Sequence, residues 1–295
     1  MATIYGSARN RSILEFVIGT EEDDLIFPLG GWDIVDGKGG IDTVVVQGLA
    51  DDFALISGDG VVYVDSLSSA SMYSERVQLI NVEKVQFSDR VIDLRDGFAF
   101  TDNPLGSDIF NGGPGIDTVS YSGPSSQYRV EKSGVFFFVE DTTRIGVQDR
   151  LGQIERVHFS DQGLAFDLNQ NAGTAAKLVG ALLGSDYVQS PAVMGIAIGL
   201  LDKGMSAADL VLTAVESDFF QQLAGGNSHE HLVRQVYRNI WGVDPDPDVA
   251  QEFIALLDKK FWSINEAVLL AASTEENLAS INLSGLTNTG VYFDY

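Results

Sequence analysis

The sequence predicts a multidomain α+β protein in which two β-rich modules, built from β-roll-like turns and small sheets, precede an all-α helical bundle. Three observations predict this fold. Gly/Asp-rich segments repeat every nine residues before residue 121, a β-patterned segment follows each block, and from about residue 170 the apolar periodicity is helical. We therefore expect four parts: a first module at 1–98, a second at 99–169, a duplicated helical bundle at 170–283 and a tail at 284–295.

Aspartates carry the nine-residue repeat. Asp24, Asp33 and Asp42 lie nine apart in GTEEDDLIF, PLGGWDIVD and GKGGIDTVV, and the residue two positions after each is apolar. A shorter copy places Asp108 and Asp117 nine apart in NPLGSDIFN and GGPGIDTVS. Such a unit can form half a turn of a parallel β-roll, in which a Gly/Asp turn leads into a short strand and the aspartate points into the turn.

Stacked turns of this kind present oxygen atoms, the ligands that Ca²⁺ prefers. We therefore predict calcium sites formed by the five aspartates together with the glycines that open the best units, which are Gly37, Gly39, Gly40, Gly112, Gly113 and Gly115. The alternative is a set of ordinary Gly/Asp turns between short strands, without an ion.

These units resemble the nonapeptide GGxGxDxUx of RTX-type (hemolysin-type) calcium-binding repeats. The match is good at 37–45 and 112–120 and partial in the other three units, which lack some of the glycines. In that family Ca²⁺ lies between turns on the same side of the roll, so the resemblance implies that Asp24 pairs with Asp42. It also implies that the two units of the second copy supply no such pair unless another segment completes it.

The segments after each Gly/Asp block are copies of one another. VEKVQFSDRVIDL (82–94) aligns with IERVHFSDQGLAFDL (154–168), and both read as strand, Ser-Asp turn and strand. Residues 60–66 and 134–142 are expected to be the partner strands. His158 falls inside this pattern, so we interpret it as a strand residue and not as a catalyst.

The helical part is itself duplicated. AAKLVGALLG (175–184) parallels HLVRQVYRNIWG (231–242), and residues 199–220 parallel 255–277. Each copy is expected to contain three helices, so that about six pack as one bundle, acting as a docking or assembly module or as a stable cap. Ser228 is expected to start a helix. The loop DPDPD (244–248) is interpreted as a helix cap, with metal binding as the alternative.

Residues 170–281 resemble the helical domain family of unknown function numbered 4214 and, more distantly, the phycobilisome linker domain. Tyr237, Gly242 and the Pro-Asp pairs of DPDPD match that family's pattern, whereas its arginine is replaced by Val243 and its aromatic pair is reduced to Phe253. The resemblance implies an architecture and a setting, because the family has no established chemistry.

The amino-acid composition excludes several classes of function. The 42 acidic and 18 basic residues give a net charge of −24, which would repel nucleic acid and anionic membranes and favour cations. The absence of cysteine excludes disulfides and thiolate catalysis. The three histidines lack zinc-protease spacing, and no nucleophile elbow, P-loop or dinucleotide fingerprint is present. We predict a structural protein without catalysis; the alternative is a calcium-stabilised accessory region or a small exported hydrolase with an unidentified carboxylate site.

No apolar segment has the length of a signal peptide or a membrane span. RTX-like proteins of this kind commonly resemble type I secretion substrates, so the resemblance implies an extracellular or cell-surface protein with a C-terminal signal in LSGLTNTGVYFDY. A closing strand is the alternative for this tail. The expected setting is adhesion, a surface layer or an extracellular matrix. The expected partners are calcium and either a second copy, another surface protein or a polysaccharide, with no nucleic acid.

Overall fold

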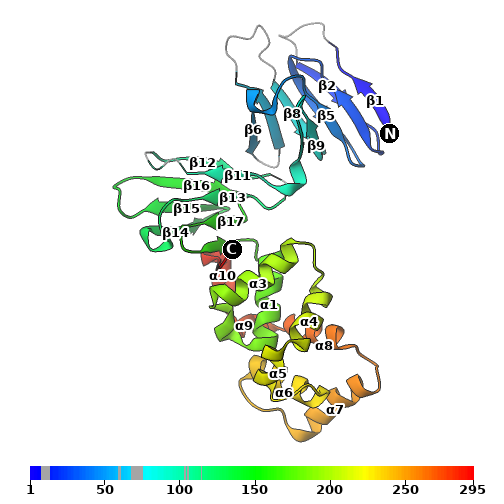
Figure 1. Cartoon of the computed structure of the whole chain (residues 1–295), viewed down its shortest axis with the longest axis vertical. Coiled ribbons are helices and arrows are strands. Elements are labelled where there is room, and N and C mark those ends of the chain that lie inside the picture. The colour runs from blue at the N-terminus through cyan, green and yellow to red at the C-terminus, as the bar shows by residue number, and fades with distance from the viewer. Residues whose placement is uncertain (8–13, 59–60, 68–75, 103, 105, 114) are drawn as a thin grey trace. The chain divides into compact units, whose positions relative to one another are not determined.

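A computed structural model describes residues 1–295 except 8–13, 59–60, 68–75, 103, 105 and 114 (Figure 1). The protein is mixed α and β, with several small sheets followed by ten C-terminal α-helices in this described part. Its internal contacts group into two compact units, residues 1–120 with 133–155 and residues 121–132 with 156–295. The four-part division drawn from the sequence stays a prediction.

The nine-residue repeat forms two parallel stacks of strands in the first unit. β1 (Ala2–Tyr5), β3 (Asp24–Phe27) and β5 (Thr43–Val45) lie in one sheet, and β2 (Leu14–Ile18) and β4 (Trp32–Asp36) in another. Leu25 faces Thr43 and Glu15 faces Asp33, so partners lie eighteen positions apart. Successive units therefore alternate between two sheets, which explains a period that belongs to neither a helix nor a single strand.

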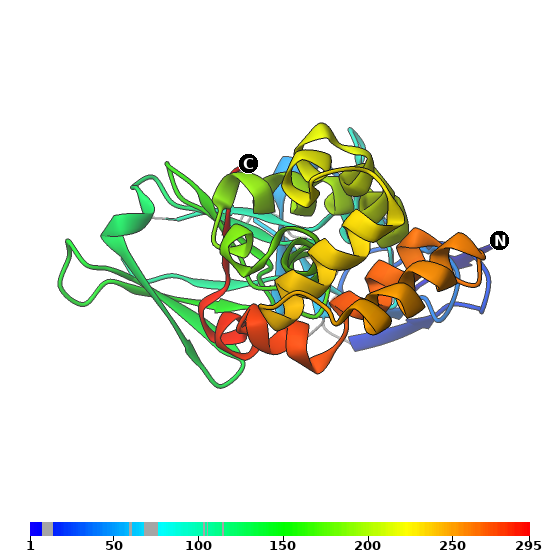
Figure 2. The same ribbon diagram turned by 90° about the horizontal axis from the view of Figure 1, so that it is seen from below.

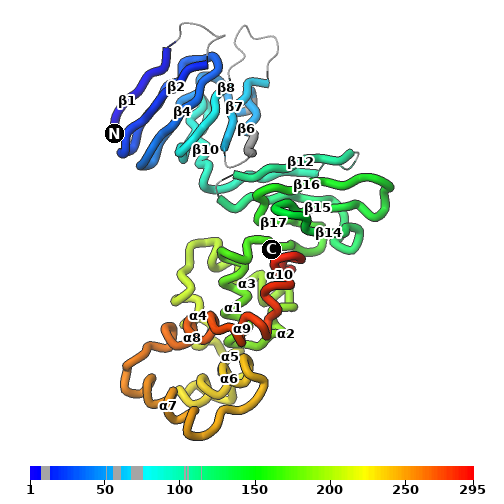
Figure 3. The backbone as a smooth tube through the Cα atoms, turned by 180° about the vertical axis from the view of Figure 1, so that it is seen from behind, coloured from blue at the N-terminus to red at the C-terminus, as the bar shows by residue number. Residues whose placement is uncertain are grey.

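A hairpin interrupts these stacks, and the chain then returns to both. The hairpin is β6 (Phe53–Gly58) with β7 (Val61–Ser66), and β8 (Arg76–Ile80) follows. β8 pairs in parallel with β4, so one sheet has the order β2-β4-β8-β7-β6 (Figure 3). β9 (Lys84–Gln86) pairs in parallel with β5 and turns into β10 (Val91–Asp93), which confirms the strand–turn–strand prediction for 82–94.

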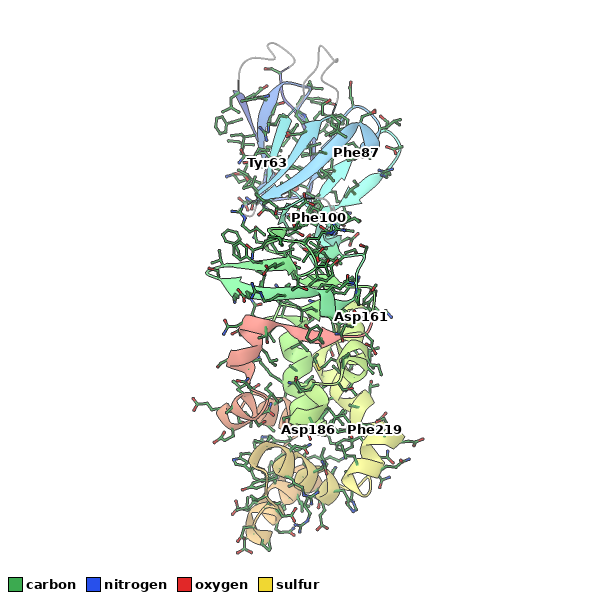
Figure 4. All side chains as sticks on the ribbon, turned by 90° about the vertical axis from the view of Figure 1, so that its left-hand side faces the viewer. Tyr63, Phe87, Phe100, Asp161, Asp186 and Phe219 are labelled. Atoms are coloured by element: carbon green, nitrogen blue, oxygen red, sulfur yellow. The ribbon has the colours of Figure 1, made fainter. Side chains whose placement is uncertain are left out.

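The core between these sheets comes from the apolar residue that follows each repeat acid by two positions. Ile26, Val35 and Val44 are completely buried there. Phe87 of the turn after β9, labelled in Figure 4, belongs to the same core. Asp24 and Asp33 already belong to strands, whereas Asp42 precedes β5. The Asp24 carboxylate still points back into the preceding turn, as expected, because it accepts from the Thr20 N–H at 2.7 Å.

The remaining strands of the first unit again form two parallel pairs, which are shorter than the two stacks described above. β11 (Ala99–Thr101) pairs in parallel with β13 (Thr118–Ser120), and β12 (Ile109–Asn111) pairs in parallel with β16 (Gln148–Gly152). β15 (Phe136–Asp141) runs antiparallel to β16 and confirms the strand expected within 134–142. Two residues of the NPLGSDIFN unit, 103 and 105, lie outside the described part.

The second unit begins with short strands and ends with one. β14 spans Tyr128–Ser133, and β17 (Arg156–His158), β18 (Gly163–Ala165) and the C-terminal β19 (Val291–Phe293) pair antiparallel in that order. The structure thus places a closing strand in the tail. The Tyr295 hydroxyl donates to the carbonyl of Phe159 at 2.5 Å, and its ring stacks on His158 with centroids 3.8 Å apart.

Ten helices, not about six, lie in the described part of this unit (Figures 1 and 2). The additional ones are short, and two of them begin at caps, Ser217 and Thr274, that directly follow the third helix of each copy. Ser228 and Asp246 cap helices as the sequence predicted. The ten are α1 Asn171–Leu183, α2 Ser185–Val188, α3 Pro191–Asp202, α4 Ala207–Glu216, α5 Asp218–Ala224, α6 His229–Trp241, α7 Pro247–Asp258, α8 Ile264–Ala272, α9 Glu275–Ser280 and α10 Leu283–Thr289.

A buried ion pair fixes the start of the helices within this unit. The Arg156 guanidinium pairs with the carboxylate of Asp167, and it reaches Asp202 at the end of α3 at 3.1 Å. Asp167 also accepts a hydrogen bond from the Ala172 N–H in α1 at 3.1 Å. No helix in the described ranges is long and apolar enough to span a membrane.

Candidate metal centre

One position recurs through the first unit, an acidic residue two places before a buried apolar residue. The five aspartates found by the nine-residue spacing all occupy it. Four further acids of the described part take the same position. Glu15 lies nine residues before Asp24 and so continues the spacing, whereas Glu83, Asp149 and Glu155 lie outside it. The inserted hairpins break the period and hide these last three from a search for nines, whereas Glu15 was missed although its spacing fits. The pattern acid-x-apolar, visible in EKV and ERV, is the signal that would have found them.

Asp24 and Asp42 lie in one stack and are joined through the backbone. The Ala2 N–H donates to Asp24 Oδ1 at 2.9 Å, and the Asp24 N–H donates to Asp42 Oδ1 at 2.8 Å. The Asp42 N–H in turn donates to Glu83 Oε2 at 2.8 Å. Each acid side chain therefore accepts from the backbone of the preceding strand, which forms a ladder of carboxylates along the stack.

The two aspartates of this ladder differ in electrostatic state. Burial acts to raise the pKa of Asp24, but hydrogen bonds from the Thr20 and Ala2 N–H groups and the Thr20 hydroxyl outweigh it, so the pKa falls below its usual value. Burial raises the pKa of Asp42 to about 6, and the neighbouring Glu83 and Asp24 carboxylates add to the rise. Asp42 Oδ2 is buried and has no hydrogen-bond partner.

Asp33 lies in the other sheet and does not join Asp24 and Asp42. Its strand partner is Glu15 of β2. Burial raises the pKa of Asp33 to about 6, and Glu15 raises it further. Asp33 Oδ2, like Asp42 Oδ2, is buried without a hydrogen-bond partner.

Asp117 is the counterpart of Asp42 in the second set of strands, but both of its oxygens are satisfied. Oδ1 accepts from the Phe98 N–H at 2.5 Å and Oδ2 from the Gly113 N–H at 2.7 Å. The Asp117 N–H donates to Glu155 Oε2 at 3.0 Å, continuing the ladder. Burial still raises the pKa of Asp117. Asp117 therefore serves to hold backbone N–H groups in place, and neither of its oxygens is left without a hydrogen bond for a cation to replace.

Asp108 lies away from Asp117, in a group of three carboxylates with Asp102 and Asp149. One oxygen from each lies within 4.8 Å of the others, and no other group of three acidic or histidine side chains in the described ranges gathers so closely. The Asp108 N–H donates to Asp149 Oδ1 at 2.7 Å, and Asp149 is 2% exposed. Burial raises the pKa of Asp102 to about 6, with Asp149 and Asp108 adding and Arg144 opposing.

The predicted glycines at the first position of the unit make room for the aspartate. A β-carbon on Gly37 would lie 2.1 Å from the Asn81 carbonyl oxygen and 2.3 Å from Asp42 Oδ2. One on Gly112 would lie 1.8 Å from the Gln153 carbonyl oxygen and 2.3 Å from Asp117 Oδ2. Only glycine allows the carboxylate and the next turn to approach so closely.

The glycines at the fourth position serve the stacking of turns. Gly40 and Gly115 have φ of +106° and +97°, and a β-carbon on either would strike the backbone of the preceding turn within 2.5 Å. Gly39 lies against the Glu21 side chain, where a β-carbon would come 2.9 Å from Oε2. Gly113 contributes the N–H that Asp117 accepts.

These residues fit a hard divalent cation. Their donor atoms are all carboxylate oxygens, two of which are buried and unpaired, and Ca²⁺ takes oxygen ligands. Asp42 and Asp102 both have other carboxylates close by. Ca²⁺ bound at either place would offset the negative charge that these carboxylates carry together.

The outer face of the β2-β4-β8-β7 sheet carries a second feature, exposed aromatic side chains beside polar ones. Phe16 and Trp32 are 65% and 53% exposed. Arg76 pairs with Asp65 at 3.0 Å and stands 5.1 Å from the ring centre of Tyr63, which is labelled in Figure 4. A shallow hollow of about 310 Å³ opens between Trp32, Tyr63 and Arg76.

No family model matches the chain, and no characterised protein is significantly similar to it in sequence. The resemblances to RTX-type repeats and to the helical family therefore depend on the motifs alone.

Proposed function

We propose that this protein is a secreted, calcium-binding structural protein of an extracellular matrix, surface layer or adhesive surface, without catalytic chemistry of its own. In this proposal the two parallel stacks are a calcium-binding β-roll and the helices form a bundle. The observation that carries it is the buried carboxylate of Asp42, which has one unpaired oxygen and other carboxylates as its charged neighbours.

The physical reason is the cost of burying a charge. An ionised carboxylate removed from water needs a charged or hydrogen-bonding partner, and otherwise takes up a proton. Ca²⁺ beside Asp42 would provide that partner at neutral pH. One site at a free Ca²⁺ concentration tenfold above its dissociation constant adds about 1.4 kcal/mol to the free energy of unfolding.

The Asp102, Asp108 and Asp149 group supplies the second candidate site. Burial raises the pKa of Asp102, and the neighbouring Asp149 and Asp108 carboxylates add to the rise; a cation placed among the three oxygens would oppose both effects. This site uses Asp108 of the repeat together with two acids outside the nine-residue spacing. In this proposal the segments that carry Asp102 and Asp149 complete the calcium site that the two repeat units of the second copy cannot form alone.

Calorimetric titration with Ca²⁺ tests the proposal. The wild type is expected to release heat on binding, D42N to lose one class of site and D149N to lose another. D117N is the matched control, because both oxygens of Asp117 already accept backbone hydrogen bonds. Absence of binding at millimolar Ca²⁺, or equal losses in all three variants, would refute it.

Export is part of the proposal, and it is supported by the same carboxylates. A β-rich unit that needs Ca²⁺ to neutralise its buried acids would remain loosely folded where Ca²⁺ is scarce and would fold where it is abundant. Labelling of intact source cells with an impermeant reagent tests the location. Labelling only after lysis would remove the extracellular role and leave calcium binding to stand alone.

A polysaccharide is the partner that the exposed sheet face favours. Trp32 and Tyr63 offer flat rings and Arg76 and Gln78 offer hydrogen bonds, a combination suited to sugar rings and hydroxyl groups. Retention on insoluble polysaccharides is expected for the wild type and reduced for W32A. The matched control is I145A, since Ile145 is fully exposed and lies outside this face. Release of soluble sugar during the assay would instead favour the hydrolase alternative.

A further inference from the structure

The helical unit contains two apolar hollows, one in each of its sequence copies. The first, of about 380 Å³, is lined by α1, α3 and α4, with Phe219 of α5 at its side (Figure 4). The second, of about 190 Å³, is lined mainly by α6, α7 and α8. Both open to the surface, because Ile196 in the first is 68% exposed and Leu270 in the second is 57% exposed. We call them groove 1 and groove 2.

The two grooves occupy corresponding places in the duplicated sequence. α3 and α7 both begin with proline and end with aspartate, and α4 and α8 both begin after a serine cap. Ala214 and Ser217 line groove 1, and their counterparts Ala271 and Thr274 line groove 2. The hollow is therefore a feature of the copied unit and not an accident of packing at one place.

An apolar surface hollow in a close-packed protein marks an interaction site. The side chains that line groove 2 are apolar except for Thr274 and the polar tips of Tyr237, Trp241 and Trp262, so apolar surface dominates the groove and few polar groups are present to orient a small polar ligand. Apolar side chains from a partner would fill such a groove, as the anchor residues of an amphipathic helix do.

The net charge of each copy narrows the class of partner further. Residues 229–276 contain nine acidic and four basic residues, and residues 171–218 contain five and two. Two of the basic residues beside groove 2 are engaged, Arg234 with Glu230 at 2.9 Å and Arg238 with Asp244 at 2.6 Å. A fatty acid or an anionic membrane would meet like charge here, whereas a helix with basic flanks would meet opposite charge.

We propose that each copy of the helical unit binds one amphipathic helix of a partner protein, with an apolar face in the groove and basic residues at its flanks. Two equivalent grooves on one chain would then bind a partner with repeated helices, and linkage would raise the overall affinity above that of either groove. This inference goes beyond the proposed calcium role and does not depend on it.

The test uses the full chain and a synthetic helix with leucine on one face and lysine at its flanks. Calorimetry is expected to give two peptides per chain. I196K and L270K are each expected to reduce this to one, with binding at the altered groove weakened about tenfold or more, and the double variant is expected to lose both. V243K is the matched control, because Val243 is 60% exposed and lines neither groove.

Three outcomes would overturn the proposal. The first is equal binding by the double variant and the wild type, with circular dichroism confirming the fold of each. The second is preference for a leucine–glutamate helix or for a fatty acid over the leucine–lysine helix. The third is self-association of the wild type that I196K and L270K abolish, which would make a second copy of this chain the occupant.

Discussion

Replacement of Asp42 by asparagine removes the negative charge of this buried side chain and leaves its size and shape nearly unchanged. The pKa of Asp42 rises from 3.8 to about 6, which corresponds to about 3 kcal/mol of lost stability when the group ionises at neutral pH. Asparagine removes this loss and keeps an oxygen for the Asp24 N–H. Its new amide N–H₂ stands where Oδ2 has no partner, which costs about 1–3 kcal/mol.

The two contributions predict that D42N is as stable as the wild type, or up to about 2 kcal/mol more stable, in the presence of a chelator. In Ca²⁺ at about a hundredfold above the dissociation constant of the Asp42 site, the wild type gains about 2.7 kcal/mol from that site. D42N gains nothing from it and keeps only the gain from the Asp102 group, so the order of stability reverses. Native-state hydrogen exchange over 24–45 measures this, with α1 as the internal reference.

The control for this experiment is D117N. Its amide would face one of two backbone N–H donors, Phe98 or Gly113, which costs about 1–3 kcal/mol, while removal of the charge relieves the burial that raises the pKa of Asp117. The net change in stability is expected to be the same in chelator and in Ca²⁺. A D42N variant that is less stable than the wild type in chelator by more than about 1 kcal/mol, or that gains as much from Ca²⁺, would refute the reasoning.

Three further predictions follow from the charges and from the tail. Asp33, Asp42 and Asp102 have a pKa raised to about 6, so the native state binds more protons than the unfolded state between about pH 4 and pH 6. Their stabilising contribution is present at acid pH and is lost as the pH rises through 6. Urea unfolding in chelator should therefore give a less stable first unit at about pH 7.5 than at about pH 5, with a smaller difference in Ca²⁺. R156L should destabilise the second unit by about 3–5 kcal/mol, because it leaves the buried Asp167 carboxylate without its cation. Burial raises the pKa of Asp167, so this loss should shrink at acid pH; a loss that does not change with pH would mean that lost packing dominates. Removal of residues 291–295 should cost about 3–6 kcal/mol, since Val291 and Phe293 are buried against β18, and a thermal midpoint equal to that of the full chain would show the tail to be dispensable.

The sequence predicts best what local pattern determines. The nine-residue spacing identified Ile26, Val35 and Val44 as equivalent, and all three are completely buried. The Ser-Asp turns are also local, since Phe87 N–H donates to the Arg90 carbonyl at 2.8 Å and Phe159 N–H to that of Gln162 at 2.9 Å. Such contacts join residues only three apart, so composition and periodicity are sufficient to predict them.

The acids outside the nine-residue spacing were missed because their partners lie far away in the chain. Asp42 and Glu83 are separated by 41 residues, and Asp108 and Asp149 by the same number. A hairpin is inserted between the members of each pair, and only the return of the chain to the same stack brings them together. The two grooves were missed for a related reason, because periodicity marks an apolar helix face without showing how completely a neighbour covers it.

The number of hydrogen bonds at each carboxylate separates the structural acids from the candidate ligands. Asp24 and Asp117 have both oxygens occupied by backbone or side-chain donors, so their charge is already compensated within the chain. Asp33 and Asp42 hold the same place in the repeat, yet each keeps one buried oxygen without a partner. A repeat that served only to turn the chain would have no reason to leave these oxygens unsatisfied, because a buried acceptor without a donor costs free energy at every such position. The difference within one repeat therefore supports the proposal that the positions of Asp33 and Asp42, more than those of Asp24 and Asp117, are suited to a cation.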